Sequence, residues 1–266
     1  MYKQNLLVLI LGIFVFAGLT GCKRKASSDE ASAAPESSQT LINQSMALYA
    51  QRDDLSKLRA AINTLKEART RDFSNYEILW RLAEYNYYLG SHTTNDEERG
   101  RAFREGIDAG KAAIQAKPDA AEGHFWLGAN YGGTAKTGVL AGLSSIDDIR
   151  NEMQAVLRID PSYEGGSAYM ILGQVSLEAP KMLGGDPSAA VEYLQKGDRL
   201  DKANPMLKLQ LAEAYFKTDR IPDAKKKLDE IDKIPPDPDY LPEHREVLEG
   251  VKDLRNRIEE KNGVKQ

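Results

Sequence analysis

Apolar side chains recur every three or four positions from Leu41 onward. This spacing places them on one face of an α-helix, and no long alternating run of the kind typical of β-strands interrupts it. Segments rich in proline, glycine and aspartate, which stop helices, separate the periodic stretches. The pattern therefore predicts an all-α protein.

A leucine followed by a small residue recurs within this pattern. The copies are Leu82-Ala83, Leu127-Gly128, Leu172-Gly173 and Leu211-Ala212, with Leu48-Tyr49 as a weaker member, and the leucines are 34, 45, 45 and 39 residues apart. A second marker, small or β-branched, lies toward the end of each following helix, at Ala68, Ala113, Val156, Gly197 and Ile231. Small side chains at such intervals let neighbouring helices approach to about 8–10 Å.

These residues resemble the tetratricopeptide (TPR) repeat, a helix–turn–helix unit of 34 residues. The matching fragments are Leu127-Gly128-x-x-Tyr131, Leu211-Ala212-x-x-Tyr215, Ala190-x-x-x-Leu194 and Ala224-x-x-x-Leu228. Pro118, Pro161 and Pro236 stand where the terminal proline of the repeat stops the second helix. No copy is complete, because Leu79, His124 and Lys208 occupy the position where the repeat favours tryptophan.

The resemblance predicts a TPR-type solenoid over residues 41–239. We expect about five helix-turn-helix units, at 42–75, 76–120, 121–163, 164–204 and 205–238. The length beyond 34 residues is assigned to long turns around residues 91–101, 132–145 and 178–186. After a proline-rich breaker, residues 240–266 are expected to form a capping helix and tail, with an apolar stripe of Val247, Val251, Leu254 and Ile258.

The first 40 residues have a different pattern. An apolar run over residues 6–18 follows Lys3 and is short for a membrane span, which predicts a signal peptide over residues 1–21. Leu19-Thr20-Gly21-Cys22 resembles the bacterial lipobox, which implies that Cys22, the only cysteine, is acylated and becomes the mature N-terminus. Residues 22–40, rich in serine, alanine and charges, predict a disordered tether.

The lipobox resemblance implies a protein held to a membrane by acyl chains on Cys22 and facing the periplasm. Lys23 stands where an aspartate often marks retention in the inner membrane, so the outer membrane is favoured. An ordinary signal peptide with a chance cysteine, or a short membrane anchor, remains the alternative.

Charge and composition exclude several classes of function. Lysine and arginine number 36 against 40 acidic residues, a net charge of −4 that leaves no basic excess for nucleic acid. One cysteine and three scattered histidines argue against a metal centre.

Catalytic motifs are weak. Residues 128–137 resemble a phosphate loop, but Ala135 replaces the glycine before lysine. Ser145, three residues before Asp148, is expected to begin a helix as a capping box. We therefore expect a non-enzymatic protein without cofactor or metal.

The middle of the chain has a narrower resemblance. It rests on residues 125–131, residues 156–166, Leu172-Gly173 and residues 179–187, which resemble the T-component family of TPR lipoproteins associated with tripartite ATP-independent periplasmic (TRAP) transporters. This resemblance implies a periplasmic substrate-binding protein as partner, and homo-oligomer formation. Its most specific piece, residues 183–187, also has a local explanation, because Asp186 is a good N-cap and Pro187 a good first helical residue.

The first helices of a TPR stack line its concave face, so residues at one helical phase define a candidate groove. The residue two before each marker leucine is apolar in all five copies, and further turns extend the same face. The predicted groove for a ligand or partner consists of Met46, Trp80, Glu84, Tyr87, Phe125, Met170, Gln174, Leu209 and Phe216. Because the apolar column lacks the basic side chains that clamp a peptide carboxylate, a hydrophobic small molecule or a docked helix fits it better.

Two functions remain open at this point. One is a solute- or partner-binding accessory of a TRAP-type uptake system that uses the hydrophobic groove. The other is an envelope scaffold that binds another protein and no small molecule. In the second case, aromatic residues such as Trp80, Phe125 and Trp126 are ordinary core, covered by the long turns.

Overall fold

The described part of the chain is helical. A computed structural model describes residues 37–135 and 139–263, without the side chains of residues 139–144 and 262, and no strand occurs within these ranges. The elements are α1 (Ser38–Tyr49), α2 (Leu55–Arg71), α3 (Tyr76–His92), α4 (Asp96–Ala116), α5 (Ala121–Ala135), α6 (Val139–Ile159), α7 (Tyr163–Glu178), η1 (Lys181–Leu183), α8 (Pro187–Leu200), α9 (Pro205–Lys217), α10 (Ile221–Ile231), η2 (Pro238–Tyr240) and α11 (Leu241–Gly263). The all-α prediction is confirmed.

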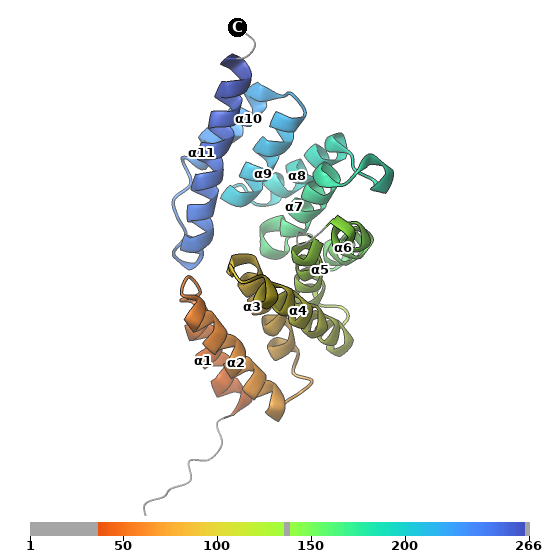
Figure 1. Ribbon diagram of the computed structural model, residues 1–266, viewed down its shortest axis with the longest axis vertical. Helices are drawn as coiled ribbons and strands as arrows, with labels where there is room; N and C mark the ends of the chain where they lie inside the picture. The colour runs from red at the N-terminus through yellow and green to blue at the C-terminus, as the bar shows by residue number, and fades with distance from the viewer. Residues whose placement is uncertain (1–36, 136–138, 264–266) are drawn as a thin grey trace, which may run out of the picture. The chain divides into compact units, whose positions relative to one another are not determined.

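The helices stack in chain order (Figure 1). Each odd-numbered helix from α1 to α9 packs against the even-numbered helix that follows it, and that helix contacts the first helix of the next pair. The first helices also contact one another in sequence, from α3 through α5 and α7 to α9, and α11 packs on α9. This arrangement is the helix-turn-helix solenoid that the repeat pattern predicts.

Polar residues begin most of these helices. Asp54, Asn75, Asn95 and Asn204 each accept a hydrogen bond from a backbone N–H of the first turn. The predicted cap at Asp186 is confirmed, because its Oδ1 accepts from the N–H groups of Ser188 at 2.8 Å and Ala189 at 3.2 Å. The capping residues therefore determine where these helices begin.

The extra length of the second unit lies in its helices, contrary to the prediction of a long turn. α3 ends at His92 and α4 already begins at Asp96. Asn95 caps α4, and the acidic residues of its first turn interact favourably with the positive end of the helix dipole. A charged run that was interpreted as a turn is thus the start of a helix.

Two smaller expectations are also wrong. Ser145 lies inside α6 and does not begin it, so it forms no capping box. α1 begins at Ser38, so the expected tether cannot extend to residue 40; the Ser37 hydroxyl accepts from the Thr40 N–H at 3.1 Å. The long connection between α7 and α8 is present as predicted and contains η1.

The glycines that follow two of the marker leucines permit close helix contact. A Cβ atom on Gly128 would lie 2.4 Å from Met153 Cε, and one on Gly173 would lie 2.5 Å from Leu194 Cγ. Both distances are shorter than any van der Waals contact. In these two units, the second helix can therefore approach the first so closely only because Gly128 and Gly173 have no side chain.

Gly173→Ala is expected to lower the free energy of unfolding by about 1–3 kcal/mol, the usual cost of overpacking. Gly132→Ala is the matched control, because its Cβ would meet only Ile149 Cδ1 at 4.0 Å and it gains helix propensity. Urea denaturation of the two variants measures the difference. Equal stability of both would contradict the close packing at Gly173.

α11 covers the end of the array. Its apolar stripe, predicted as Val247, Val251, Leu254 and Ile258, is fully buried in one cluster with residues of α9 and α10, including Leu211 and Leu228. The prediction of a capping helix is confirmed.

Candidate functional site

The nine predicted groove residues lie on α1, α3, α5, α7 and α9, but they differ in exposure. Met46 is 41% exposed, whereas Phe125 and Leu209 are buried at 6% and 7%. The others are half-buried: Trp80, Glu84, Tyr87, Met170, Gln174 and Phe216. The predicted face is therefore only partly open to solvent.

An aromatic row connects three first helices. The ring centroids of Tyr87 and Trp126 are 5.8 Å apart, those of Trp126 and Phe125 are 5.0 Å apart, and those of Phe125 and Tyr163 are 5.2 Å apart. Trp126 and Tyr163 were not among the predicted groove residues. The row joins α3 to the start of α7 through α5.

The C-terminal members of the predicted groove belong to packing around α11. The Phe216 ring lies under Arg257 and Lys261, with the charged groups 4.9 and 5.0 Å from its centroid. Met170 packs against the same C-terminal core cluster. Gln174 donates to Glu178 on its own helix at 3.3 Å. At this end of the predicted groove, side chains of the protein itself cover the groove residues.

Glu84 has the most unusual environment of the predicted residues. Its Oε2 atom is shielded from solvent and has no hydrogen-bond partner in the part of the chain that the structure describes. Burial raises the pKa of Glu84 to about 7; the nearby Arg81 opposes this shift, and Glu164 adds to it. A buried carboxylate oxygen without a hydrogen-bond partner among the described residues is the feature that distinguishes this face.

Glu164 supplies the second carboxyl group, from an unusual backbone position at the start of α7. Its φ is +46° and its ψ is 48°, and Gly165 and Gly166 also have positive φ values. This left-handed region is uncommon for a residue with a side chain. Glu164 is exposed. Partial desolvation by the surrounding protein raises its pKa, and a hydrogen bond with Tyr240 opposes this shift.

We call Tyr49, Glu84, Trp126, Tyr163 and Glu164 the Glu84 cluster. Trp126 Nε1 is a second buried polar atom without a hydrogen-bond partner among the described residues. Burial raises the pKa values of Tyr49 and Tyr163, and the nearby charge of Glu84 adds to both shifts. The cluster thus combines acidic and aromatic groups from α1, α3, α5 and α7.

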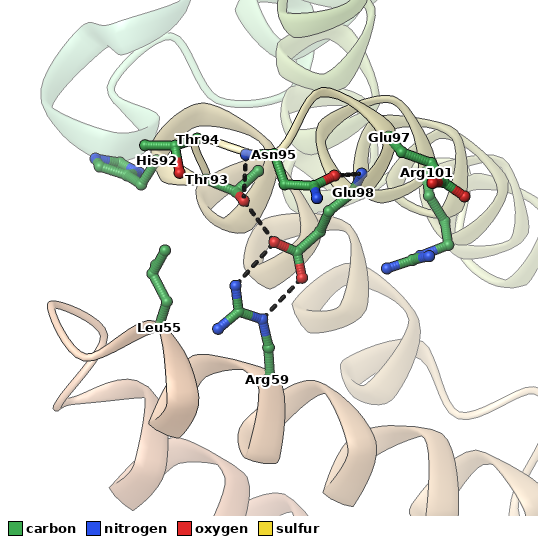
Figure 2. A pocket seen from close by; sticks show the side chains of 9 residues that line it. All are labelled: Leu55, Arg59, His92, Thr93, Thr94, Asn95, Glu97, Glu98 and Arg101. Carbon is green, nitrogen blue, oxygen red and sulfur yellow. Dashed lines mark hydrogen bonds and ion pairs between the residues drawn. The ribbon is translucent and has the colours of Figure 1, made fainter.

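Two adjoining pockets lie elsewhere, beside the α1–α2 turn. The first has a volume of about 420 Å³ and is lined by residues of the α1–α2 and α3–α4 regions, including Leu55, Arg59, His92 and Arg101. Figure 2 shows that the Glu98 carboxylate lies at its centre and faces Arg59. Arg59 Nε and Nη2 donate to the two Glu98 oxygens at 2.7 and 2.8 Å.

The Glu98 carboxylate is strongly stabilised in its charged form. The hydrogen bonds from Arg59 and Thr93 lower the pKa of Glu98 to about 2. The main anion of the first pocket is therefore already paired within the protein.

The second pocket, of about 350 Å³, lies where α11 meets the first helix pair and is lined by Arg52, Tyr88, His92, Glu246 and neighbouring residues. Arg52 Nη2 lies 2.8 Å from Glu243 Oε2, and His92 Nε2 lies 2.7 Å from Glu246 Oε1. The lower end of α11 accordingly faces the α1–α2 turn in Figure 1. We call these contacts the α11 seam.

None of the nine predicted groove residues lines either pocket. The seam contacts could not be predicted from sequence, because Arg52 and Glu243 are 191 residues apart. The pairing of charges within both pockets indicates that they stabilise the contact between elements. The Glu84 cluster, where polar groups lack partners, is the better candidate for binding.

Further observations limit the chemistry. No group of three or more histidine, cysteine or acidic side chains that could hold a metal occurs among residues 37–135 and 139–263. None of the helices in these ranges combines the length and the hydrophobicity of a transmembrane span. Cys22 lies outside the described residues, so its lipidation stays a prediction.

Solved structures with the same fold support the TPR assignment. TTC0263, a thermophilic TPR protein of Thermus thermophilus, has a TM-score of 0.62 at 18% identity, over 82% of this chain and 98% of that one. Pseudomonas aeruginosa pilF has a TM-score of 0.54 at 18% identity, over 83% and 91%. PilW, described as a widely conserved type IV pilus biogenesis factor, has a TM-score of 0.53 with the same identity and coverage. At this identity, the similarity shows the fold alone.

A comparison with curated proteins gave no match. The narrower resemblance to the T-component family stays a prediction. A sequence model of one family, described as regulator of microtubule dynamics protein 1-3, matches residues 41–256, which include α2 to α10 and most of α1 and α11. The chain therefore belongs to the regulator of microtubule dynamics protein 1-3 family.

Proposed function

We propose that this chain is a non-catalytic binding protein that takes up a solute, or a segment of a protein partner, at the Glu84 cluster. The observation that carries the proposal is the buried, unpartnered Oε2 of Glu84 on a half-buried side chain. An unsatisfied buried polar atom costs about 1–3 kcal/mol, which a ligand recovers by pairing with it. The aromatic row beside Glu84 supplies the apolar contact surface.

The finer part of the proposal concerns location and partner. We infer that acyl chains on Cys22 hold the protein to the bacterial envelope facing the periplasm, and that it assists a TRAP-type uptake system. The lipobox supports the anchor, and the T-component-like segments support a periplasmic substrate-binding protein as partner.

Native mass spectrometry of protein purified without detergent tests the binding function. We expect wild-type protein to carry a bound molecule that organic extraction releases, and Trp126→Ala to carry less than a tenth of it. Phe73→Ala is the control, because Phe73 is exposed and lies outside the cluster. Empty wild-type protein whose thermal stability is unchanged by lipids and organic solutes would contradict the proposal.

The anchor has its own test. Cys22→Ser is expected to shift the protein from the membrane fraction to the soluble fraction, because it removes the acylation site. Fractionation of cells that express either form measures this, and acyl mass on the wild-type N-terminal peptide is the positive control. A Cys22→Ser variant that stays with membranes would rule out this anchor.

The envelope scaffold remains a second candidate. It is favoured by the burial of Phe125 and Leu209, which leaves less open apolar surface than predicted. This scaffold function would be supported if substitutions of exposed residues outside the Glu84 cluster abolished binding of a protein partner while Trp126→Ala left that binding unchanged.

A further inference from the structure

Two carboxyl groups of the Glu84 cluster lack ionic partners. In the described ranges, neither Glu84 nor Glu164 forms an ion pair. The two side chains come from different helices, α3 and α7, which the aromatic row joins. Tyr87, three residues after Glu84, contacts Trp126, and Tyr163, next to Glu164, contacts Phe125. Two ionisable acids therefore share one aromatic environment, and neither of them pairs directly with a positive charge in the described ranges.

The basic residues near Glu84 are already engaged. Arg52 forms a two-pronged pair with Glu243, with Nε–Oε1 and Nη2–Oε2 distances of 3.1 and 2.8 Å. Arg81 pairs with Glu77 at 2.9 Å. Both guanidinium groups favour the charged form of Glu84 through space, but neither pairs with it. The Oε2 acceptor is therefore left for a cation from outside the chain.

We propose that the Glu84 cluster binds a positively charged group, a guanidinium or an ammonium, between Glu84 and Glu164. The inference rests on the proposed function and names the chemical class of its ligand. The buried Oε2 of Glu84 is the acceptor that such a donor would satisfy.

Aromatic rings strengthen the preference for a cation. Their faces are electronegative and attract guanidinium and ammonium groups. The same region already contains such contacts, because Arg81 lies 4.3 Å from the Trp80 ring centroid and Arg52 lies 5.1 Å from that of Tyr49. An anionic ligand would instead meet two carboxylates, of which that of Glu84 is shielded from solvent, and this is unfavourable.

The backbone at Glu164 supports a functional role for its side chain. A left-handed conformation costs a non-glycine residue energy that a glycine would avoid, and such strain is retained where a side chain has a task. Glu164 lies directly before two glycines that adopt the same conformation. Glu164→Gly is therefore expected to fold normally and to lose binding, which separates the two roles.

The two tryptophans of the chain, Trp80 and Trp126, report on this site. Trp80 lies one helical turn before Glu84, and Trp126 belongs to the cluster. The test is a fluorescence titration at pH 8 with butylguanidinium and with butylurea, which has a similar shape and no charge. We expect saturable binding of butylguanidinium and at least tenfold weaker binding of butylurea.

Variants locate the response. Glu84→Gln and Glu164→Gly are each expected to weaken butylguanidinium binding at least fivefold. Glu97→Gln, which removes an exposed carboxylate beside the first pocket, is expected to leave it unchanged. Equal binding of butylurea, absence of saturable binding, or full binding by both cluster variants would overturn the inference.

A peptide arm distinguishes the source of the cation. Acetyl-Gly-Arg-Gly-amide that binds at least as tightly as butylguanidinium would indicate a basic side chain of a partner, and weaker peptide binding would indicate a free organic cation. Pentanoate separates this inference from the proposed function. Saturable pentanoate binding that requires Trp126, without butylguanidinium binding, would overturn the cation inference and leave the binding function intact.

Discussion

Replacing Arg52 by alanine is expected to lower the free energy of unfolding by about 3 kcal/mol and to release the start of α11 from the first helix pair. Arg52 is 6% exposed, and its Nη2 also donates to the Asp239 carbonyl oxygen at 2.7 Å. The side chain thus closes the α11 seam with several charge-assisted hydrogen bonds.

The size of this effect follows from the burial of the pair. Removing one partner of a buried ion pair leaves the other charge uncompensated, which costs about 3–5 kcal/mol. We place the loss at the low end, because the Glu243 side chain is 31% exposed and water can stabilise it in part.

Urea denaturation measures the loss, and Lys66→Ala is the matched control. Lys66 pairs with Glu105 at 2.6 Å, but the two side chains are 48% and 36% exposed. Exposed pairs contribute less than about 1 kcal/mol. Similar losses in both variants would show that the α11 seam adds no particular stability.

Glu84→Gln is expected to have the opposite effect and to raise the free energy of unfolding at pH 8 by about 2 kcal/mol. In the folded protein the pKa of Glu84 is about 7, above its ordinary value of 4.5. This difference corresponds to at most about 3 kcal/mol, and we reduce it because solvent screens a half-buried side chain.

The sign of the pH dependence follows from proton binding. Between pH 4.5 and about 7 the folded state holds the Glu84 proton more tightly than the unfolded state does, so stability falls as the pH rises through this window. Arg81, Arg52 and the Tyr49 phenol reduce this penalty without removing it. Glutamine has no proton to lose, so the variant should differ little from wild type at pH 4.5 and most above pH 7.

Glu98→Gln provides a control of opposite sign. The pKa of Glu98 is lowered to about 2, so its carboxylate stabilises the fold above pH 4.5, and this stability is lost as the pH falls toward 2. Replacing glutamate by glutamine should therefore destabilise the protein at position 98 and stabilise it at position 84. Destabilisation of Glu84→Gln at pH 8 would mean that the Glu84 carboxylate is satisfied within the chain.

Local features of the fold could be predicted from sequence. Helix periodicity, the small residue after each marker leucine and the Asp186 cap depend on neighbours in the chain, and the structure contains them. The charged start of α4 was misinterpreted, because acidic residues suit both a turn and the first turn of a helix. Recognising Asn95 as an N-cap would have distinguished the start of a helix from a turn.

The candidate site was predictable only in part. The position of Glu84 on the helix face identified it as a groove residue. The face alone could not show that Phe125 is buried or that the Glu84 Oε2 atom lacks a hydrogen-bond partner among the described residues. The approach of Glu164 and Tyr240 joins segments distant in sequence through tertiary packing. The Glu-Gly-Gly run at residues 164–166 was the available signal, since it is typical of a backbone with positive φ.

The most direct test of the binding account is a carbon-13 NMR titration of the Glu84 carboxyl group, with Glu84→Gln used for assignment. We predict an apparent pKa near 7 in the free protein, because burial disfavours the charged form, and a fall of at least one unit when butylguanidinium is saturating. A pKa of the Glu84 carboxyl group near the ordinary value of 4.5, unchanged by butylguanidinium, would contradict the binding account.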